Sequence, residues 1–149
     1  MTPNRDAASR TSPVSALPPA VYAADITPVA IDLRDFQSAT LLLQVGIGGI
    51  TFSGTNKIEF VLTHSDDDTT YTAVTDDDLV KDGLTAATVT NGIIRSLISA
   101  HAAATLQKVG YVGGKRYLKL LPDFSGTHGT GTPIAATIVR SRATLIGAA

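Results

Sequence analysis

The residues best suited by type and spacing to do chemistry are residues 113–116 (GGKR), two glycines followed by two cations. A glycine-rich loop that cradles phosphates needs the pattern G-x-x-x-x-G-K-[ST] between a strand and a helix. Val109 occupies the position of the first glycine, and Arg116 that of the magnesium-binding hydroxyl. Because strand-forming residues follow, the pattern argues against a nucleotide site. It predicts a β-hairpin that joins residues 106–111 to residues 116–121.

A second candidate is the run HSDDD from His64 to Asp68, whose clustered carboxylates suit calcium. An EF-hand loop needs a glycine at its sixth position and a glutamate at its twelfth. Counting from Asp66, these positions hold Tyr71 and Asp77. We interpret the run as a solvated turn between two strands, and no metal site is predicted.

A third candidate is Ser125 in the stretch DFSGTHG, which is similar to the nucleophile elbow G-x-S-x-G. Asp123 stands where the first glycine belongs, and His128 lies in a loop of Gly and Thr. The other histidines, His64 and His101, are scattered along the chain, so no acid–base pair is recognisable. The sequence therefore predicts that the protein is not an enzyme and uses no cofactor.

The composition argues against several further classes of protein. The 149 residues suit one domain, and the net charge of −1 makes a general nucleic-acid binder an unlikely class. No apolar run reaches the 18 residues of a membrane span, and the first residues lack the apolar core of a secretory signal. The absence of cysteine favours assembly in a reducing cytoplasm.

Short strand-like runs separated by Gly, Ser, Thr and Asp turns predict an all-β domain over residues 29–149. The expected fold is a jelly-roll-like β-sandwich of about eight strands. The runs are residues 29–33, 39–45, 57–63, 71–74, 93–98, 106–111, 116–121 and 135–140, the last with an optional extension to Leu145. Their inward faces predict the core residues Leu41, Leu43, Ile58, Phe60, Leu62, Val109, Leu118, Leu120 and Ile138. Residues 76–81 suit one helical turn, and residues 99–104 suit helix or loop equally.

Residues 1–28 differ from the rest, since they hold five of the seven prolines and no periodic apolar pattern. Proline and its preceding residue favour extended backbone, which predicts an N-terminal arm. We expect its apolar residues to bury against a neighbouring molecule; a loose tail is the alternative. These residues are Val14, Leu17, Val21 and Tyr22.

The charges are segregated along the chain. Seven of the thirteen acidic residues lie between Asp66 and Asp82, and seven of the twelve basic residues lie from Arg95 onward. Because they fall in different turns and strands, we expect opposite charges to meet across an interface rather than within one chain. Loops that only solvate the surface are the alternative. The residues concerned are Asp76, Asp77, Asp78, Lys115, Arg116 and Lys119.

Four stretches in this order carry a resemblance to a known family: residues 39–45, 57–62 (KIEFVL), 64–74 (HSDDDTTYTAV) and 109–117 (VGYVGGKRY). Together they resemble small structural proteins of tailed bacteriophages, in particular the capsid cement or head-decoration proteins. The resemblance covers about residues 29–145 and includes no catalytic motif.

The resemblance implies a jelly-roll-like fold and an oligomer, a dimer or trimer, on the outside of a capsid. Such a protein bridges major capsid protein subunits in a virion assembled in the host cytoplasm. The alternative is a carbohydrate-binding β-sandwich module of a phage tail or surface protein. That class usually binds glycans with exposed aromatic rings, and this chain has four Tyr, four Phe and no Trp.

Overall fold

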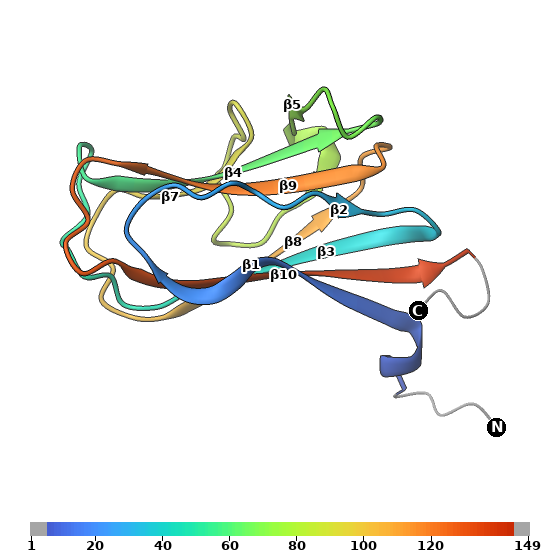
Figure 1. The fold of residues 1–149 in the computed structure, drawn as a ribbon, viewed down its shortest axis with the longest axis horizontal. Coiled ribbons are helices and arrows are strands. Elements are labelled where there is room, and N and C mark those ends of the chain that lie inside the picture. The colour runs from blue at the N-terminus through green and yellow to red at the C-terminus, as the bar shows by residue number, and fades with distance from the viewer. Residues whose placement is uncertain (1–5, 145–149) are drawn as a thin grey trace.

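The computed structural model describes residues 6–144, which form two antiparallel β-sheets packed face to face (Figure 1). Sheet A has the strand order β1 (Thr11–Tyr22), β10 (Thr132–Ala143), β3 (Phe36–Val45), β8 (Thr105–Tyr111) and β6 (Leu79–Val80). Sheet B has the order β2 (Ile31–Asp32), β9 (Tyr117–Ser125), β4 (Lys57–Ser65) and β5 (Thr72–Ala73), and β7 (Ile93–Leu97) also pairs with β4. Two 3-10 turns complete it, η1 (Ala8–Arg10) and η2 (Asp76–Asp78). The predicted all-β sandwich is confirmed, with ten strands instead of about eight.

The core lies between the sheets and follows the period-2 alternation of the strands. In β4 the side chains of Ile58, Phe60 and Leu62 point inward, and the residues between them are half-buried. All nine predicted core residues are at most 3% exposed. Burying a large apolar side chain contributes ~1.5–3 kcal/mol, so these inner faces hold the two sheets together.

The structure corrects the prediction of an N-terminal arm. Residues 11–22 form β1, which pairs with β10 from Thr11↔Ser141 to Tyr22↔Thr132, and Leu17 is fully buried in the chain's own core. The register shifts twice between Ser15 and Ala20, where the strand passes its prolines. β1 lies at the edge of sheet A, and an edge strand tolerates proline because its outer side makes no ladder hydrogen bonds. Residues 1–5 of the predicted arm lie outside the described residues.

The structure also corrects the prediction of a hairpin between residues 106–111 and residues 116–121. β8 belongs to sheet A and β9 to sheet B, so residues 112–116 cross from one sheet to the other. The φ angles of Gly113 and Gly114 are not positive, so the glycines do not serve a left-handed turn. Gly113 instead lies against the ring of Tyr111, and a Cβ atom there would come within 2.6 Å of the phenol oxygen.

The structure also settles the two segments in which the sequence suits a helical turn. Residues 99–104 form a loop. Of the helical turn expected at residues 76–81, only Asp76–Asp78 form a helical turn, η2, and Leu79–Val80 belong to β6. The optional extension of the last strand to Leu145 lies outside the described residues.

Candidate interaction surfaces

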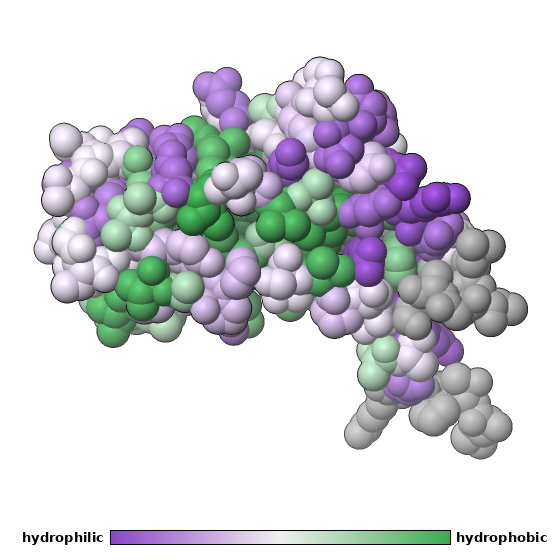
Figure 2. Space-filling model, viewed as in Figure 1, coloured by the Kyte–Doolittle hydropathy of each residue, from purple (hydrophilic) through white to green (hydrophobic). Residues whose placement is uncertain are grey.

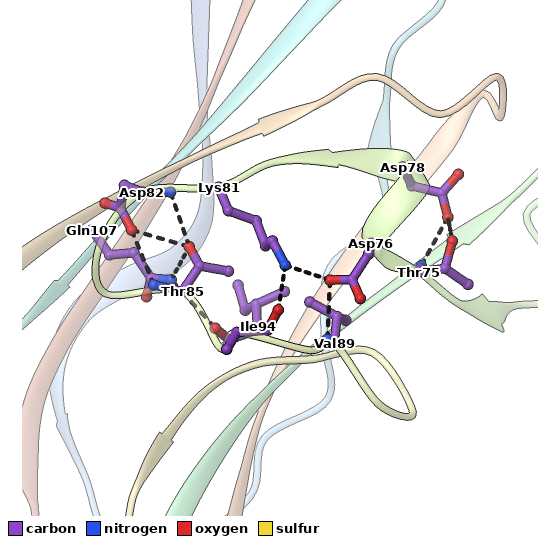
Figure 3. A network of polar contacts seen from close by, with 10 residues as sticks. Thr75, Asp76, Asp78, Lys81, Asp82, Thr85, Val89, Ile94 and Gln107 are labelled. Carbon is purple, nitrogen blue, oxygen red and sulfur yellow. Dashed lines mark hydrogen bonds and ion pairs between the residues drawn. The ribbon is translucent and has the colours of Figure 1, made fainter.

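Two carboxylates of the acidic segment 76–78 make hydrogen bonds within their own part of the chain. In η2, the carboxylate of Asp78 accepts hydrogen bonds from the backbone N–H and the hydroxyl of Thr75, at 2.8 and 3.0 Å. Asp76 accepts from Lys81 Nζ at 2.6 Å and from the backbone N–H of Val89 at 3.1 Å (Figure 3). Asp78 therefore stabilises the turn η2 itself, and Asp76 ties this turn to the connection between β6 and β7.

Asp82 ties the same connection to sheet A. One carboxylate oxygen accepts from the backbone N–H of Lys108 at 2.7 Å, and the other accepts from Leu84 and Thr85. Next to it, Gln107 donates to the hydroxyl of Thr85 at 3.0 Å (Figure 3). Burial raises the pKa of Asp82, but these hydrogen bonds outweigh it, so the net pKa lies below the usual value.

The prediction that Asp76, Asp77 and Asp78 lie in an interface stays a prediction. Asp76 and Asp78 are engaged within the chain, as the previous contacts show. Asp77 is exposed, and its carboxylate makes no hydrogen bond within residues 6–144. Of the three carboxylates, Asp77 is the one without a hydrogen-bond partner among the described residues.

The basic residues also find partners inside the chain. Arg116 donates Nε and Nη2 to the two carboxylate oxygens of Asp32, both at 2.8 Å, and this pairing lowers the pKa of Asp32 to about 2. Lys115 Nζ lies 3.7 Å from Asp66, whose side chain is exposed. The expectation that these charges cannot all neutralise one another locally overlooked the local pairs of Lys115 and Arg116. It underestimated how closely sheet packing brings distant turns together.

Lys119 is placed differently from the other two cations. Its ammonium group lies 4.1 Å from the centroid of the Tyr71 ring, a cation–π contact on the outer surface of sheet B. It has no ion pair among the described residues.

A charged groove of about 430 Å³ lies between residues 33–39 and residues 112–116. Its charged lining residues are Arg34, Asp35, Asp66, Lys115 and Arg116. We call this surface the charged groove. It brings together two of the predicted interface residues, Lys115 and Arg116.

Tyr111 lines the charged groove and contacts a buried histidine. Its hydroxyl accepts the backbone N–H of Lys115 at 3.1 Å and lies 2.9 Å from His64 Nδ1. The hydroxyl can therefore donate its own proton to Nδ1, which places the histidine proton on Nε2. Burial lowers the pKa of His64 and raises that of Tyr111, so both are neutral at pH 7. No local pattern in the sequence indicates this pair, since its partners lie 47 residues apart.

A second groove of about 600 Å³ lies on the outer face of sheet A, at the end where β10 begins. Its lining carries no charged side chain, and its only polar side chains are Gln44 and Thr105. The lining residues come from β1, β3, β8, β10 and the loop before β8: Pro19, Ala20, Val21, Gln44, Val45, Gly46, Ala104, Thr105, Leu106, Pro133, Ile134 and Ala135. Apolar surface gathers at this end of the sandwich, at the lower left of Figure 2. We call it the apolar groove.

Of the four apolar residues predicted to lie in an interface, one lines the apolar groove and three belong to the core or its edge. Val21 lines the apolar groove and is 61% exposed. Leu17 is a core residue, while Val14 and Tyr22 pack against the core from its edge. Leu106, 57% exposed, was missed, although the phase of β8 points to it because Gln107 and Val109 face inward.

The two grooves lie at opposite ends of the same strands. Tyr111 at the charged groove pairs with Ala39, and Thr105 at the apolar groove pairs with Val45. Six residues of strand separate these positions, which corresponds to ~20 Å. The sandwich therefore presents two chemically different surfaces far apart.

The other candidates of the sequence have structural roles. Asp67 accepts hydrogen bonds from the backbone N–H groups of Thr69 and Thr70, which makes the acidic run a turn. His128 is buried against Phe124, and its Nε2–H donates to the carbonyl oxygen of Ser125, not to its hydroxyl.

Residues 6–144 contain neither a cluster of metal ligands nor a membrane-spanning helix. No three metal-ligating side chains lie together there, and no helix in this part is long and apolar enough to cross a membrane. The chain matches no protein-family model, no curated protein and no solved structure.

Proposed function

We propose that this chain is a structural virion protein that binds the outside of a phage capsid lattice and bridges or stabilises major capsid protein subunits. The observation that carries the proposal is the presence of an uncharged apolar groove and a charged groove at opposite ends of one small sandwich. Large exposed apolar surface marks protein contacts. A second, charged contact surface is what a bridging protein needs in addition.

The sequence supports the proposal through its resemblance to capsid cement proteins. Such proteins have a jelly-roll-like β fold, and the chain has an all-β sandwich. The position of the protein on the capsid exterior follows from this resemblance and stays a proposal.

The charged groove and its surroundings are the proposed capsid contact. Lys115 holds Asp66 only at 3.7 Å, and Lys119 rests on an aromatic ring, so both ammonium groups can pair with acidic residues of a capsid subunit. Each exposed pair contributes only ~0–1 kcal/mol and is weakened by salt. Together such pairs select orientation and register more than they add affinity. Arg116 contributes by shaping the groove, because Asp32 already occupies its guanidinium.

The carbohydrate-binding alternative receives no support from the apolar groove. No aromatic ring lines that groove, whereas sugar-binding sites use such rings as stacking platforms. The two aromatic rings of the charged groove are already engaged, since Arg140 lies over Phe36 and Tyr111 is buried. We therefore keep the capsid proposal alone.

Co-sedimentation with capsids tests the proposal. The partner is the major capsid protein encoded nearest to this chain in the same genome, assembled into empty capsids. We expect the protein to sediment with these capsids, and the double variant Lys115→Glu/Lys119→Glu to bind more weakly at low salt.

The matched control is Lys108→Glu, an exposed lysine outside the charged groove, which should bind like the wild type. Absence of the wild-type protein from the capsid pellet at every salt concentration would refute the proposed function. Equal binding by the double variant would refute the assignment of the charged groove alone.

A further inference from the structure

The sheet edges leave little room for a partner strand. β1, at one edge of sheet A, contains Pro13, Pro18 and Pro19, and proline cannot donate to a ladder. Of the other edge strands, β2, β5 and β6 have two residues each, and β7, which pairs only with β4, has five. Since short and proline-containing edges discourage added strands, a partner is better accommodated on a face of the sandwich.

The apolar groove limits the chemistry of its occupant. A charged segment would lose its water there without meeting an opposite charge, because the lining has none. The groove volume of about 600 Å³ suits a short apolar peptide segment. The occupant is therefore expected to be short and apolar, with no charged side chain.

The chain itself contains such a segment. Residues 145–149 read LIGAA and have no charged or polar side chain. They follow β10, whose last residue Ala143 pairs with Phe36 at the charged groove. The first ten residues of the chain, MTPNRDAASR, carry three charges and do not fit an uncharged groove.

A copy cannot fill its own groove with this segment. The groove residue Ala135 lies eight positions before Ala143 along β10, a distance of ~26 Å. The six residues from 144 to 149 span at most ~20 Å when fully extended. The segment can therefore enter only the groove of another molecule.

We propose that the apolar groove of one copy binds residues 145–149 of a second copy. An antiparallel pair of copies can exchange these segments reciprocally, and a ring can pass them from each copy to the next. Both arrangements are closed and leave no groove empty. The contact does not depend on capsid attachment, so its test and the capsid test can fail independently.

Engineered cysteines test the contact in the full-length protein, because the native chain has none. Two single variants are made, Ala135→Cys in the groove and Ala148→Cys in the C-terminal segment. Under mild oxidation, a mixture of the two is expected to give a disulfide-linked 1:1 dimer, and neither variant alone should give comparable yield. A mixture that cross-links no better than each variant alone would overturn the proposal.

Sedimentation velocity of full-length variants gives an independent readout. Leu106→Asp and Ile146→Asp place a charge on the two sides of the proposed contact, and each is expected to raise the dissociation constant by about 10–100-fold. Val80→Asp is the matched control, since Val80 is 60% exposed on a strand of the same sheet but does not line the groove. It should associate like the wild type.

Three outcomes of this experiment would overturn the proposal. The first is a wild-type protein that stays monomeric at all concentrations. The second is association that Leu106→Asp weakens and Ile146→Asp does not, which assigns the groove to another segment of the second copy. The third is normal association with lost capsid binding in Leu106→Asp, which assigns the groove to the capsid protein.

Discussion

Replacing Asp82 by asparagine is expected to lower the free energy of unfolding by about 1–3 kcal/mol at pH 7. The carboxylate accepts four hydrogen bonds, three at one oxygen from Leu84 and Thr85 and one at the other from the backbone N–H of Lys108. An asparagine can keep the three at its single oxygen. Its amide group then faces the Lys108 N–H at 2.7 Å, so a charged hydrogen bond worth ~1.5–3 kcal/mol is replaced by two opposed donors. Partial exposure of Asp82 lets water relieve some of this cost.

The pH dependence identifies the cause. The folded-state pKa of Asp82 is lower than its unfolded value, so its contribution to stability is present above about pH 4. It is lost as the pH falls through the folded-state pKa. A protonated aspartate carries a donor as asparagine does, so the difference in stability between wild type and variant should shrink as the pH falls from 7 to below 3.

Urea unfolding followed by far-UV circular dichroism measures both quantities, since the chain has no tryptophan for fluorescence. The control is Asp77→Asn, an exposed position whose substitution should change stability by less than ~0.5 kcal/mol. Equal stability of Asp82→Asn and wild type at pH 7 would refute the structural role of this carboxylate. A difference that stays constant down to pH 3 would refute the electrostatic explanation.

Three further predictions concern stability and use the same denaturation assay. Phe60→Ala should cost ~3–5 kcal/mol because the ring is fully buried between the sheets, and a loss below 1 kcal/mol would contradict that burial. Leu17→Ala should cost ~2–5 kcal/mol even in a monomer, whereas an arm that orders only on assembly predicts no change. Asp32→Asn should cost ~1 kcal/mol at pH 7, because its paired side chains are 41% and 40% exposed. The pKa of Asp32 of about 2 means that its contribution is complete above about pH 4 and disappears toward pH 2, which a pH series of the two proteins checks.

The inward faces of the strands could be predicted because the period-2 pattern is local. Ile58, Phe60 and Leu62 alternate with less buried residues, and no knowledge of the neighbouring strands is needed to place them inside. The partner of a strand is a different matter. Leu118 and Leu120 alternate equally well in a hairpin with β8 and in a ladder with β4, and only the packing of the whole domain selects β4.

The partners of the charged residues could not be predicted from the sequence either. Asp82 lies among acidic neighbours in the sequence, but its partner is a backbone N–H 26 residues away. The partner of Arg116 lies 84 residues away, at Asp32. Composition reveals that acids and bases are segregated along the chain, whereas their pairing depends on which turns the sandwich brings to the same end.

The apolar groove could have been found in part from the same alternation that revealed the core. In β8 the inward positions are Gln107, Val109 and Tyr111, so an apolar residue in the opposite phase, Leu106, has to face outward. The sandwich covers only the inner face of sheet A, and an outward leucine therefore has no internal reason to be apolar. That Val21, from a strand that the prolines concealed, lines the same groove is visible only in the folded chain. Apolar residues in the outward phase of a strand are thus the signal for a contact surface, and the strand pairing decides whether they form one groove.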